Sequence, residues 1–510
     1  MSARKPQSKE TLKHLGVSIY KYTMPKRADQ LLAEVSYYAV SQGTLVATDD
    51  EALMRDIIGR VNGEQVPGKV LAQDPMFLEA REKAKMSNAA QVEFFVRPLG
   101  IARVLRSIGG KRSKSSADML VVLQNQGFTA IQCVVGEVRI GQASLDMQYN
   151  GYVLADRPLP GSAGVLDFPN AASDAIPNFV VHDISSLLVT NWNAKEAFWK
   201  VEGLVDEIAG TPGVFAEVIE GIKQDPNGPR IDIAVDVLPQ LTNDIYSISD
   251  SKAGKADVDS RRNLIALKIK DTAAMARVLD QAMQNEPDAE ELDFNGHPIW
   301  QVVHREDELA DLDADFGEFG AAPAPANAPQ PWLSNWAITV HDGYLMFASH
   351  PEMIQEAITQ AKRSPTSPLE QEPDYQRVKS AIGDTFGQQQ GSAWQIVRNS
   401  LAYRVPYELF REGKLKDSQS MFASLLDRLL QGDDEITAKE QVVKGTNLPP
   451  FETVAKFLQP SGLMFRSTDS GWQFGGLLLS AQPTQVPVAL PEATQATSVG
   501  TARVNSEANR

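Results

Sequence analysis

The chain has 510 residues, 43% of them hydrophobic and 22% charged, with a formal net charge of −16 at pH 7. This length exceeds the roughly 250–300 residues at which one core stops growing, so we expect two or more domains. The acidic charge argues against nucleic acid as a partner, no apolar stretch approaches the ~18 residues of a transmembrane helix, and one cysteine excludes an internal disulfide framework. The N-terminus, MSARKPQSKETLKHLGVSIYKYTM, lacks the apolar core of a signal peptide.

The first predicted element is a β-hairpin that leads into a helix. SYYAV and TLVA alternate apolar and polar residues around the turn Gln42-Gly43. Thr48-x-x-Glu51 has the pattern of a capping box, in which the hydroxyl accepts an amide of the first helical turn. We therefore expect a helix that is capped by Thr48 and ends at Gly59. Its predicted buried face carries Leu53 and Ile57.

The segment GEQVPGKV follows this helix and spaces Gly63, Gly68 and Lys69 as a phosphate-binding loop would. Val70 stands where such a loop needs a hydroxyl for Mg²⁺, so we interpret the segment as a turn-rich linker.

Later segments predict an antiparallel α+β fold. After Gly127 the strands TAIQCVVG, VRIGQASLDMQY and GYVLAD form a meander, and the apolar surroundings of Cys133 predict a buried, inert thiol. From Ile176 come strand SSLLV, helical AKEAFWKVEGLVDEIAG, strand LIALKIK, helix DTAAMARVLDQAM and strand PIWQVVH. Strands grouped in hairpins with separate helices indicate α+β with antiparallel sheets rather than a doubly wound parallel sheet.

A second hairpin and helix repeat the first. VHDGYLMFASHPEMIQEAI places Asp342-Gly343 in the turn, and Ser349-x-x-Glu352 gives another capping-box pattern. Ile354 and Ile358 then repeat on one helix face. The two turn glycines lie 300 positions apart (343 − 43), and we infer an internal duplication.

Flanking segments match in the same order. LEQEPDYQRVK matches LAQDPMFLEAR, LQPSGLMFR matches LQNQGFTAI, and NGHPIWQVVH matches LGVSIYKYTM. The matched residues include these pairs: Gly16 with Gly296, Pro75 with Pro373, Phe77 with Tyr375, Arg97 with Arg398, and Arg103 with Arg404.

These matches divide the chain. We expect a first repeat unit over residues 1–172, a complete second unit over 173–480 and a disordered tail over 481–510. The second unit contains an acidic, Ala/Pro-rich insert, residues 305–332, that predicts a flexible surface loop. The first unit lacks a counterpart of Ile176–Asn295. Either the sequence is an N-terminally shortened form, or that segment serves both halves.

The DGYLMFASHPEMIQEAI segment, the following LEQEPDYQRV and the closing GLMFRSTDSGWQFGGLLL resemble a family of duplicated bacterial proteins of unknown function. The family is of planctomycete type, and the resemblance implies an exported or envelope-associated protein. Its motifs are structural, so it implies no catalytic residues.

Other candidate site residues favour structural roles. Asp311, Asp313 and Asp315 have calcium-loop spacing, but Phe316 and Ala322 replace the required Gly and Glu, which favours a solvated loop. His297 and His304 lie an odd number apart on a predicted strand, so they point to opposite faces, which disfavours joint binding of a metal. We expect structural or surface roles for these two histidines and for His341 and His350. The paired arginines are expected to form salt bridges within the fold, with anion binding as the alternative.

No catalytic, cofactor-binding or metal-binding residues are therefore predicted. The first functional hypothesis is a non-catalytic, envelope-associated structural or interaction protein with an unidentified protein partner. The second is a carrier of an apolar ligand under a curved sheet. The third is an unrecognised hydrolase, which would need clustered carboxylates or histidines in a cleft.

Overall fold

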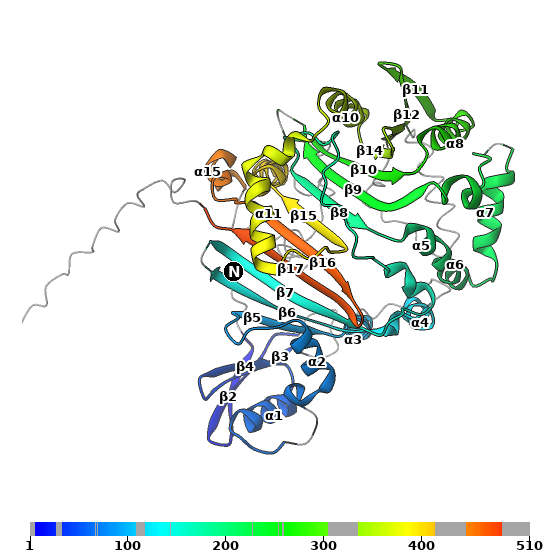
Figure 1. Ribbon diagram of the computed structural model, residues 1–510. Coiled ribbons are helices and arrows are strands. Elements are labelled where there is room, and N and C mark those ends of the chain that lie inside the picture. Colours follow the sequence, from blue (N-terminus) through cyan, green and yellow to red (C-terminus); the bar gives the residue numbers. More distant parts are fainter. Residues whose placement is uncertain are drawn as a thin grey trace, which may run out of the picture. The chain divides into compact units, whose positions relative to one another are not determined.

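The computed structural model describes residues 6–26, 33–66, 68, 70–108, 118–142, 144–226, 228–252, 254, 256–257, 260–303, 335–413 and 445–481. The predicted insert 305–332 and the tail from residue 482 lie outside these ranges, as do Lys69, His304 and the acidic triplet at 311, 313 and 315. The chain divides into two compact units, with Glu82 and Lys83 at the boundary. Both consist of antiparallel sheets with helices, so the predicted α+β class is confirmed (Figure 1).

The first unit is a four-stranded sheet in the order β1-β2-β3-β4, with one face covered by helix α1. On that face Met54 and Ile58 pack against Ile19, Ala39 and Val46. The elements are β1 (Ser8–His14), β2 (Val17–Thr23), β3 (Val35–Ser41), β4 (Thr44–Thr48), α1 (Glu51–Val61) and α2 (Pro75–Lys83), which ends at the boundary.

The second unit is built on a thirteen-stranded sheet in the order β11-β12-β13-β14-β10-β9-β8-β15-β16-β17-β7-β6-β5. Its strands are β5 (Val92–Val96), β6 (Ile131–Gln142), β7 (Leu145–Ala155), β8 (Ser186–Asn191), β9 (Leu241–Ser251), β10 (Arg261–Ile269), β11 (Ala289–Phe294), β12 (His297–Val303), β13 (Asn335–His341), β14 (Tyr344–Ala348), β15 (Ala393–Val397), β16 (Ser461–Thr468) and β17 (Gly471–Leu479). Its helices are α3 (Pro98–Ile108), α4 (Met119–Asn125), α5 (Ala194–Lys200), α6 (Glu202–Ala209), α7 (Val214–Gln224), α8 (Thr272–Gln284), α10 (Pro351–Arg363), α11 (Pro373–Phe386), α12 (Asn399–Ala402), α13 (Arg404–Arg411) and α15 (Phe451–Ala455).

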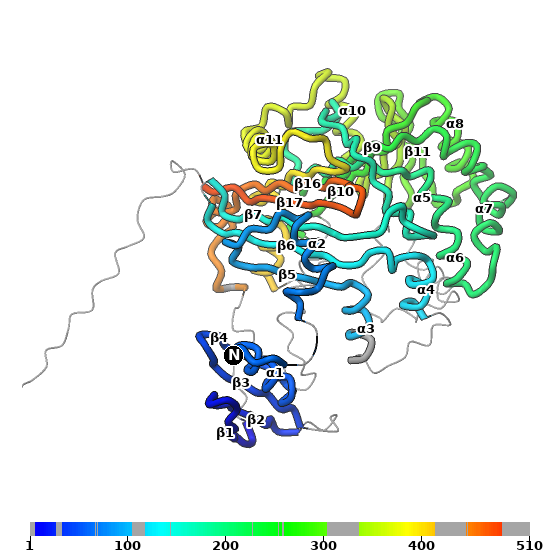
Figure 2. The backbone as a smooth tube through the Cα atoms, turned by 60° about the horizontal axis from the view of Figure 1, so that its bottom comes forward, coloured from blue at the N-terminus to red at the C-terminus, as the bar shows by residue number. Residues whose placement is uncertain are grey.

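Helices cover both faces of this sheet at its β11–β14 end. Helix α10 buries Ile354 and Ile358 in a large core that also includes residues of β8–β10 and β17. Helix α8 packs Met275 and Leu279 on the opposite face, against side chains of β12, β13 and β14. Helix α11 lies over β16 and β17 further along the sheet (Figure 2).

The two predicted hairpins are confirmed, and their backbones agree. Gln42-Gly43 has φ values of 49° and 76°, and Asp342-Gly343 has 47° and 83°, which a two-residue turn of this kind requires. Tyr37 pairs with Thr48 in the first hairpin, and Ala337 pairs with Ala348 in the second, so both partners shift by 300 positions (337 − 37 and 348 − 48).

The two capping-box predictions are wrong. Helix α1 is capped by Asp50, whose carboxylate accepts the Leu53 amide at 2.7 Å, while Thr48 only accepts the amide of Asp50. A carboxylate two residues nearer the helix is the better acceptor for that amide. In α10, Pro351 fixes the first helical position, and Ser349 instead accepts the Asn263 amide of β10.

The predicted end of α1 is also wrong, and of the two residues on its predicted face only Ile57 packs against the core. Leu53 is 50% exposed, and the buried residues are Met54, Ile58 and Gly59. The helix continues past Gly59 to Val61, and the glycine instead makes room for Val66, because a Cβ atom there would come within 2.8 Å of a methyl group. In α10 the predicted pair Ile354 and Ile358 is buried.

The predicted three-stranded meander after Gly127 consists of two long strands, β6 and β7. Gly136 and Gly151 lie opposite each other inside these strands. A Cβ atom would come within 2.4 Å of the Phe94 ring at Gly136 and within 2.3 Å of the Phe474 ring at Gly151. The glycines therefore make room for aromatic rings instead of forming turns. In the matched segments LQNQGFTAI and LQPSGLMFR, Gly127 lies in a turn, whereas Gly462 lies inside β16.

Candidate binding pocket

The second unit contains a cavity of about 130 Å³ between α11 and the sheet. Helix α11 supplies one wall, β15 and Met464 of β16 supply the floor, and the loop 387–391 closes one side. Cross-strand pairing places Trp394 and Met464 on the same sheet face, below the helix.

Glycines in the sheet bring α11 close at one end of this cavity. At Gly462 a Cβ atom would lie 2.5 Å from Val378 and 2.7 Å from Ile382, and at Gly475 it would lie 2.3 Å from the Phe386 ring. The helix can approach β16 and β17 this closely only because these positions have no side chain.

The cavity has an apolar interior and a polar rim. Its interior is formed by Val378, Ile382, Ile396, Met464 and the Trp394 ring, while Lys379, Asp174 and Gln388–Gln390 provide polar groups. The Tyr375 and Trp394 ring centroids are 6.4 Å apart, and the Lys379 ammonium lies 5.5 Å from the Tyr375 centroid. Burial raises the pKa of Tyr375, so its hydroxyl remains a neutral hydrogen-bonding group at neutral pH.

The rim loop is held in place by hydrogen bonds from several elements. The Gly391 carbonyl accepts the Ala172 amide at 3.0 Å, and the Gln390 side chain donates to the Ala172 carbonyl at 3.0 Å. Arg466 of β16 donates to the Gln389 carbonyl at 2.8 Å. A rim fixed in this way loses little freedom when a ligand binds.

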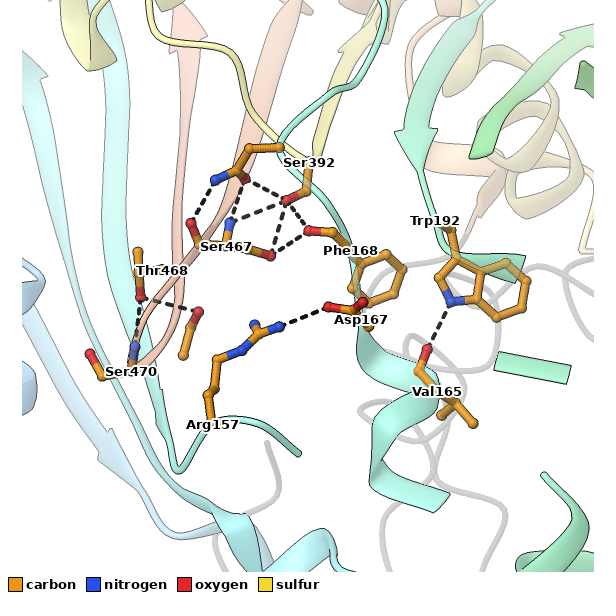
Figure 3. Close-up of polar contacts among 11 residues, drawn as sticks. Arg157, Val165, Asp167, Phe168, Trp192, Ser392, Ser467, Thr468 and Ser470 are labelled. Atoms are coloured by element: carbon orange, nitrogen blue, oxygen red, sulfur yellow. Dashed lines mark hydrogen bonds and ion pairs between the residues drawn. The ribbon is translucent and has the colours of Figure 1, made fainter. Parts of the chain in front are cut away.

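A buried polar network continues from this loop to the end of β16 (Figure 3). The Ser392 hydroxyl is fully buried, 2.7 Å from both the Phe168 carbonyl and the Asn170 side-chain oxygen. Asn170 accepts the Ser467 amide at 2.8 Å and donates to the Ser467 carbonyl at 2.8 Å. Satisfied polar groups of this kind fix a unique arrangement, here of the segment before β8 against β15 and β16.

A separate ion pair lies on the segment that follows β7, and it includes Asp167, the neighbour of Phe168 in the chain. Arg157 donates to Asp167 at 2.9 Å, and its guanidinium lies 5.3 Å from the Trp472 ring centroid (Figure 3 shows the ion pair). The Tyr152 hydroxyl contacts Thr468 and Ser470 at the β16–β17 turn. These contacts tie β7, β16 and the 157–170 segment together beside the pocket.

The paired arginines occupy different surroundings. Arg398 forms ion pairs with Glu372 at 3.2 Å and Asp374 at 3.4 Å, and Arg404 donates to the carbonyls of Lys252 and Gly254. Arg97 lies beside the Phe95 ring, and Arg103 is exposed. Arg398 thus takes the structural role expected from the sequence.

The structure brings together two histidines that the sequence analysis did not pair. His297 and His341 have ring centroids 4.6 Å apart, beside a second hollow of about 380 Å³ that Thr272 and Lys362 also line. Burial and the neighbouring His297 lower the pKa of His341. Among the described residues, no three His, Cys, Asp or Glu side chains lie close enough to hold a metal ion.

The remaining candidates show no ligand geometry. Cys133 is buried in β6. Gly63 and Gly68 are exposed with positive φ angles, and His350 contacts the Ser349 hydroxyl. None of the helices in the described ranges has the length and apolar character needed to span a membrane.

Fold and pocket together define an antiparallel α+β protein with a small, mostly apolar cavity. Residues 241–394, which run from β9 to β15 and include α11, match the family model "Protein of unknown function (DUF3352)". The chain therefore contains a DUF3352 domain of unknown function. No curated protein is significantly similar to the chain.

One solved structure is similar in part, "Structure of crystal form I of TP0453". It is 9% identical, the match covers 61% of this chain and 80% of that chain, and the TM-score is 0.25.

Sequence reasoning did not identify the pocket residues. In the sequence Tyr375 stands out only as a match to Phe77, and Trp394 and Met464 carry no signal because they meet only through the pairing of β15 with β16. The unusual segment GQQQG, residues 387–391, was the one local sign of a polar loop.

Proposed function

We propose that the protein is a non-catalytic carrier of a small molecule with an apolar body and a polar end, bound in the α11 pocket. The observation that carries this proposal is the cavity of about 130 Å³ with an apolar interior and a rim of Lys379, Asp174 and glutamines. A cavity of roughly 150 Å³ lined by apolar side chains binds benzene, so this one suits an aromatic ring or a short alkyl chain.

The test is a thermal-shift titration with hexanol, hexanoate and hexylamine. All three share the apolar chain, so each should raise the thermal midpoint by mass action. Lys379→Ala should weaken the binding of hexanoate alone, because it removes the positive charge. Asp174→Ala should weaken the binding of hexylamine alone, because it removes the negative charge. Lys456→Ala is the matched control, because Lys456 lies over Phe457 outside the pocket.

A pocket-filling variant separates specific from non-specific binding. Ile396 lies on the floor of the cavity, on the same sheet face as Trp394 and Met464, and Ile396→Trp should abolish all three shifts by occupying the apolar interior. Equal shifts in the wild-type protein and this variant would refute the carrier proposal.

The interaction role expected from the sequence is the second candidate. It is favoured by large apolar side chains exposed on the β1–β4 sheet, among them Tyr38, Val40 and Leu45. Such side chains gathered on one surface are typical of a protein-binding site.

We further propose that the chain is internally duplicated, with repeat units over residues 1–172 and 173–480. The matching hairpin registers support this. So do the helices that follow, because Met54 and Ile58 of α1 and Ile354 and Ile358 of α10, also 300 positions apart, are all buried. Leu12 pairs with Ile19 and Leu292 pairs with Ile299, a shift of 280 that agrees with the upstream sequence match.

A further inference from the structure

In the part of the chain that the structure describes, no helix covers one face of the β1–β4 sheet, whereas the counterpart of this face in the second unit is covered. We call it the outer face; it is opposite α1 and carries Tyr20, Tyr38, Val40 and Leu45. The matched positions in the second unit are Trp300, Ile338, Val340 and Leu345, and helix α8 lies over them.

Exposure differs sharply between the two faces. Tyr20, Tyr38 and Leu45 are 40%, 41% and 70% exposed. Their counterparts Trp300, Ile338 and Leu345 are 7%, 4% and 7% exposed. The sheet surfaces are similar in apolar character, so the difference comes from what covers them.

The covering element in the second unit shows what such a face accepts. Helix α8 presents Met275 and Leu279 to the sheet, and its Asp280 accepts a hydrogen bond from the Trp300 indole at 3.3 Å. An amphipathic helix laid on an apolar surface through residues four apart is a common mode of recognition.

Charge at the edge of the outer face adds a second requirement. Lys9 and Lys13 of β1 lie on this face, and the Lys9 ammonium is 4.9 Å from the Tyr20 ring centroid. The matched positions of β11 are Ala289 and Asp293. Strand pairing places no acidic residue of β1–β4 on the outer face. A helix that binds there is therefore favoured by acidic side chains, in an otherwise acidic protein.

We propose that the outer face binds an amphipathic helix of another protein, with an apolar stripe over Tyr38 and Leu45 and acidic residues toward Lys9 and Lys13. The inference rests on the interaction role proposed above. In a second copy of this chain, α8 already covers its own sheet. It could bind the outer face of another copy only if that core were unpacked. A separate protein is the partner that fits.

The experiment uses the full chain and two fluorescent peptides of residues 271–285, one with the natural α8 sequence and one carrying Arg277→Glu. Arg277 is exposed on α8, so the change alters charge without removing the apolar stripe. Fluorescence anisotropy should show saturable binding of both peptides and tighter binding of the acidic one. Leu45→Lys should weaken both by at least about tenfold, because it removes a large apolar contact.

Matched variants distinguish the possible outcomes. Leu53→Lys places the same change on the exposed side of α1 and should leave binding unchanged. The double variant Lys9→Glu/Lys13→Glu should reverse the order of the two affinities, so that the natural peptide binds more tightly than the acidic one. Thermal midpoints of all variants verify folding.

Several results would overturn the inference. The first is that neither peptide binds, and the second is that Leu45→Lys does not weaken the binding. The third is that the double charge reversal leaves the acidic peptide as the tighter binder. Self-association of the wild-type chain that Leu45→Lys abolishes would identify a second copy as the occupant. If Leu45→Lys instead releases a captured protein while neither peptide binds, the helix inference fails and the interaction role stands.

Discussion

The β1–β4 sheet with α1 and the β11–β14 strands with α10 are built alike and surrounded differently. Both contain a hairpin with the same register and a helix that buries two residues four apart on one sheet face. In the second unit β14 pairs onward with β10 and α8 covers the remaining face, whereas β4 is an edge strand. The comparison shows that neighbours added elsewhere in the sequence decide whether such a module is a core or a surface.

The largest expected effect concerns β10, which has no counterpart beside β4. Arg262 donates to Asp250 at 2.7 and 2.8 Å and to Glu356 at 3.0 Å, with side-chain exposures of 11% for Arg262 and 5% for Asp250. Burial opposes the charge of Arg262, but these carboxylates raise its pKa above the usual value. Arg262→Met should cost about 3–5 kcal/mol because Asp250 is left buried without its partner.

Denaturant unfolding followed by site-specific probes in each unit measures this effect. The loss should fall on the second unit and leave the first unchanged. Lys268→Met is the control, since the Lys268–Asp244 pair is 3.8 Å long and partly exposed, and it should cost less than about 1 kcal/mol. If Arg262→Met lowered the free energy of unfolding as little as Lys268→Met does, the β9–β10 pair would not be tightly packed.

The next prediction tests the equivalence of α1 and α10. Ile58 and Ile358 are both fully buried. Ile58→Ala and Ile358→Ala should each destabilise their own unit by about 2–5 kcal/mol, through lost burial and the cavity left behind. Leu53→Ala, at the exposed position that the sequence wrongly assigned to the core, should cost less than about 0.5 kcal/mol. Similar costs for Ile58→Ala and Leu53→Ala would contradict the equivalence.

A smaller effect distinguishes the starts of the two helices. Asp50→Ala should destabilise the first unit by about 0.5–2 kcal/mol, because the Leu53 amide loses its acceptor. Asp50→Asn should restore most of that loss, since asparagine caps helices about as well. Ser349→Ala should instead weaken the contact with the Asn263 amide of β10. Amide exchange at Leu53 and Asn263 would separate the two roles.

The smallest effect depends on pH and is confined to the second unit. Burial, followed by His297, lowers the pKa of His341 below its usual value of 6.5, so the unfolded chain binds this proton more readily. The stability contribution is complete above pH 6.5 and is lost as the pH falls through the folded pKa. His341→Gln should flatten the decline of unfolding free energy in that range. An unchanged slope would show that His341 does not titrate as its surroundings imply, and Ser41 at the matched position gives the first unit no such dependence.

Local signals predicted much of the fold. Gln42-Gly43 and Asp342-Gly343 fixed both turns, and strand alternation identified the hairpins around them. The errors arose where distant residues intervene. Gly136 and Gly151 resemble turn residues in the sequence, but they make room for Phe94 and Phe474, which come from other strands.

The pocket was beyond sequence reasoning for the same reason. Its walls come from α11, β15 and β16, and no single segment contains the pattern. The cap errors have a different origin, because Thr48 and Asp50 are both good acceptors and only the chain path chooses between them.

The most direct test of the comparison is amide hydrogen exchange of β4 against β14. Residues 344–348 pair with both β13 and β10, while residues 44–48 pair with β3 alone. At neutral pH we expect the amides of β14 to be protected throughout, whereas every second amide of β4 should exchange rapidly. Equal protection of the two strands would show that β4 is covered like β14 and would contradict its assignment as an exposed edge strand.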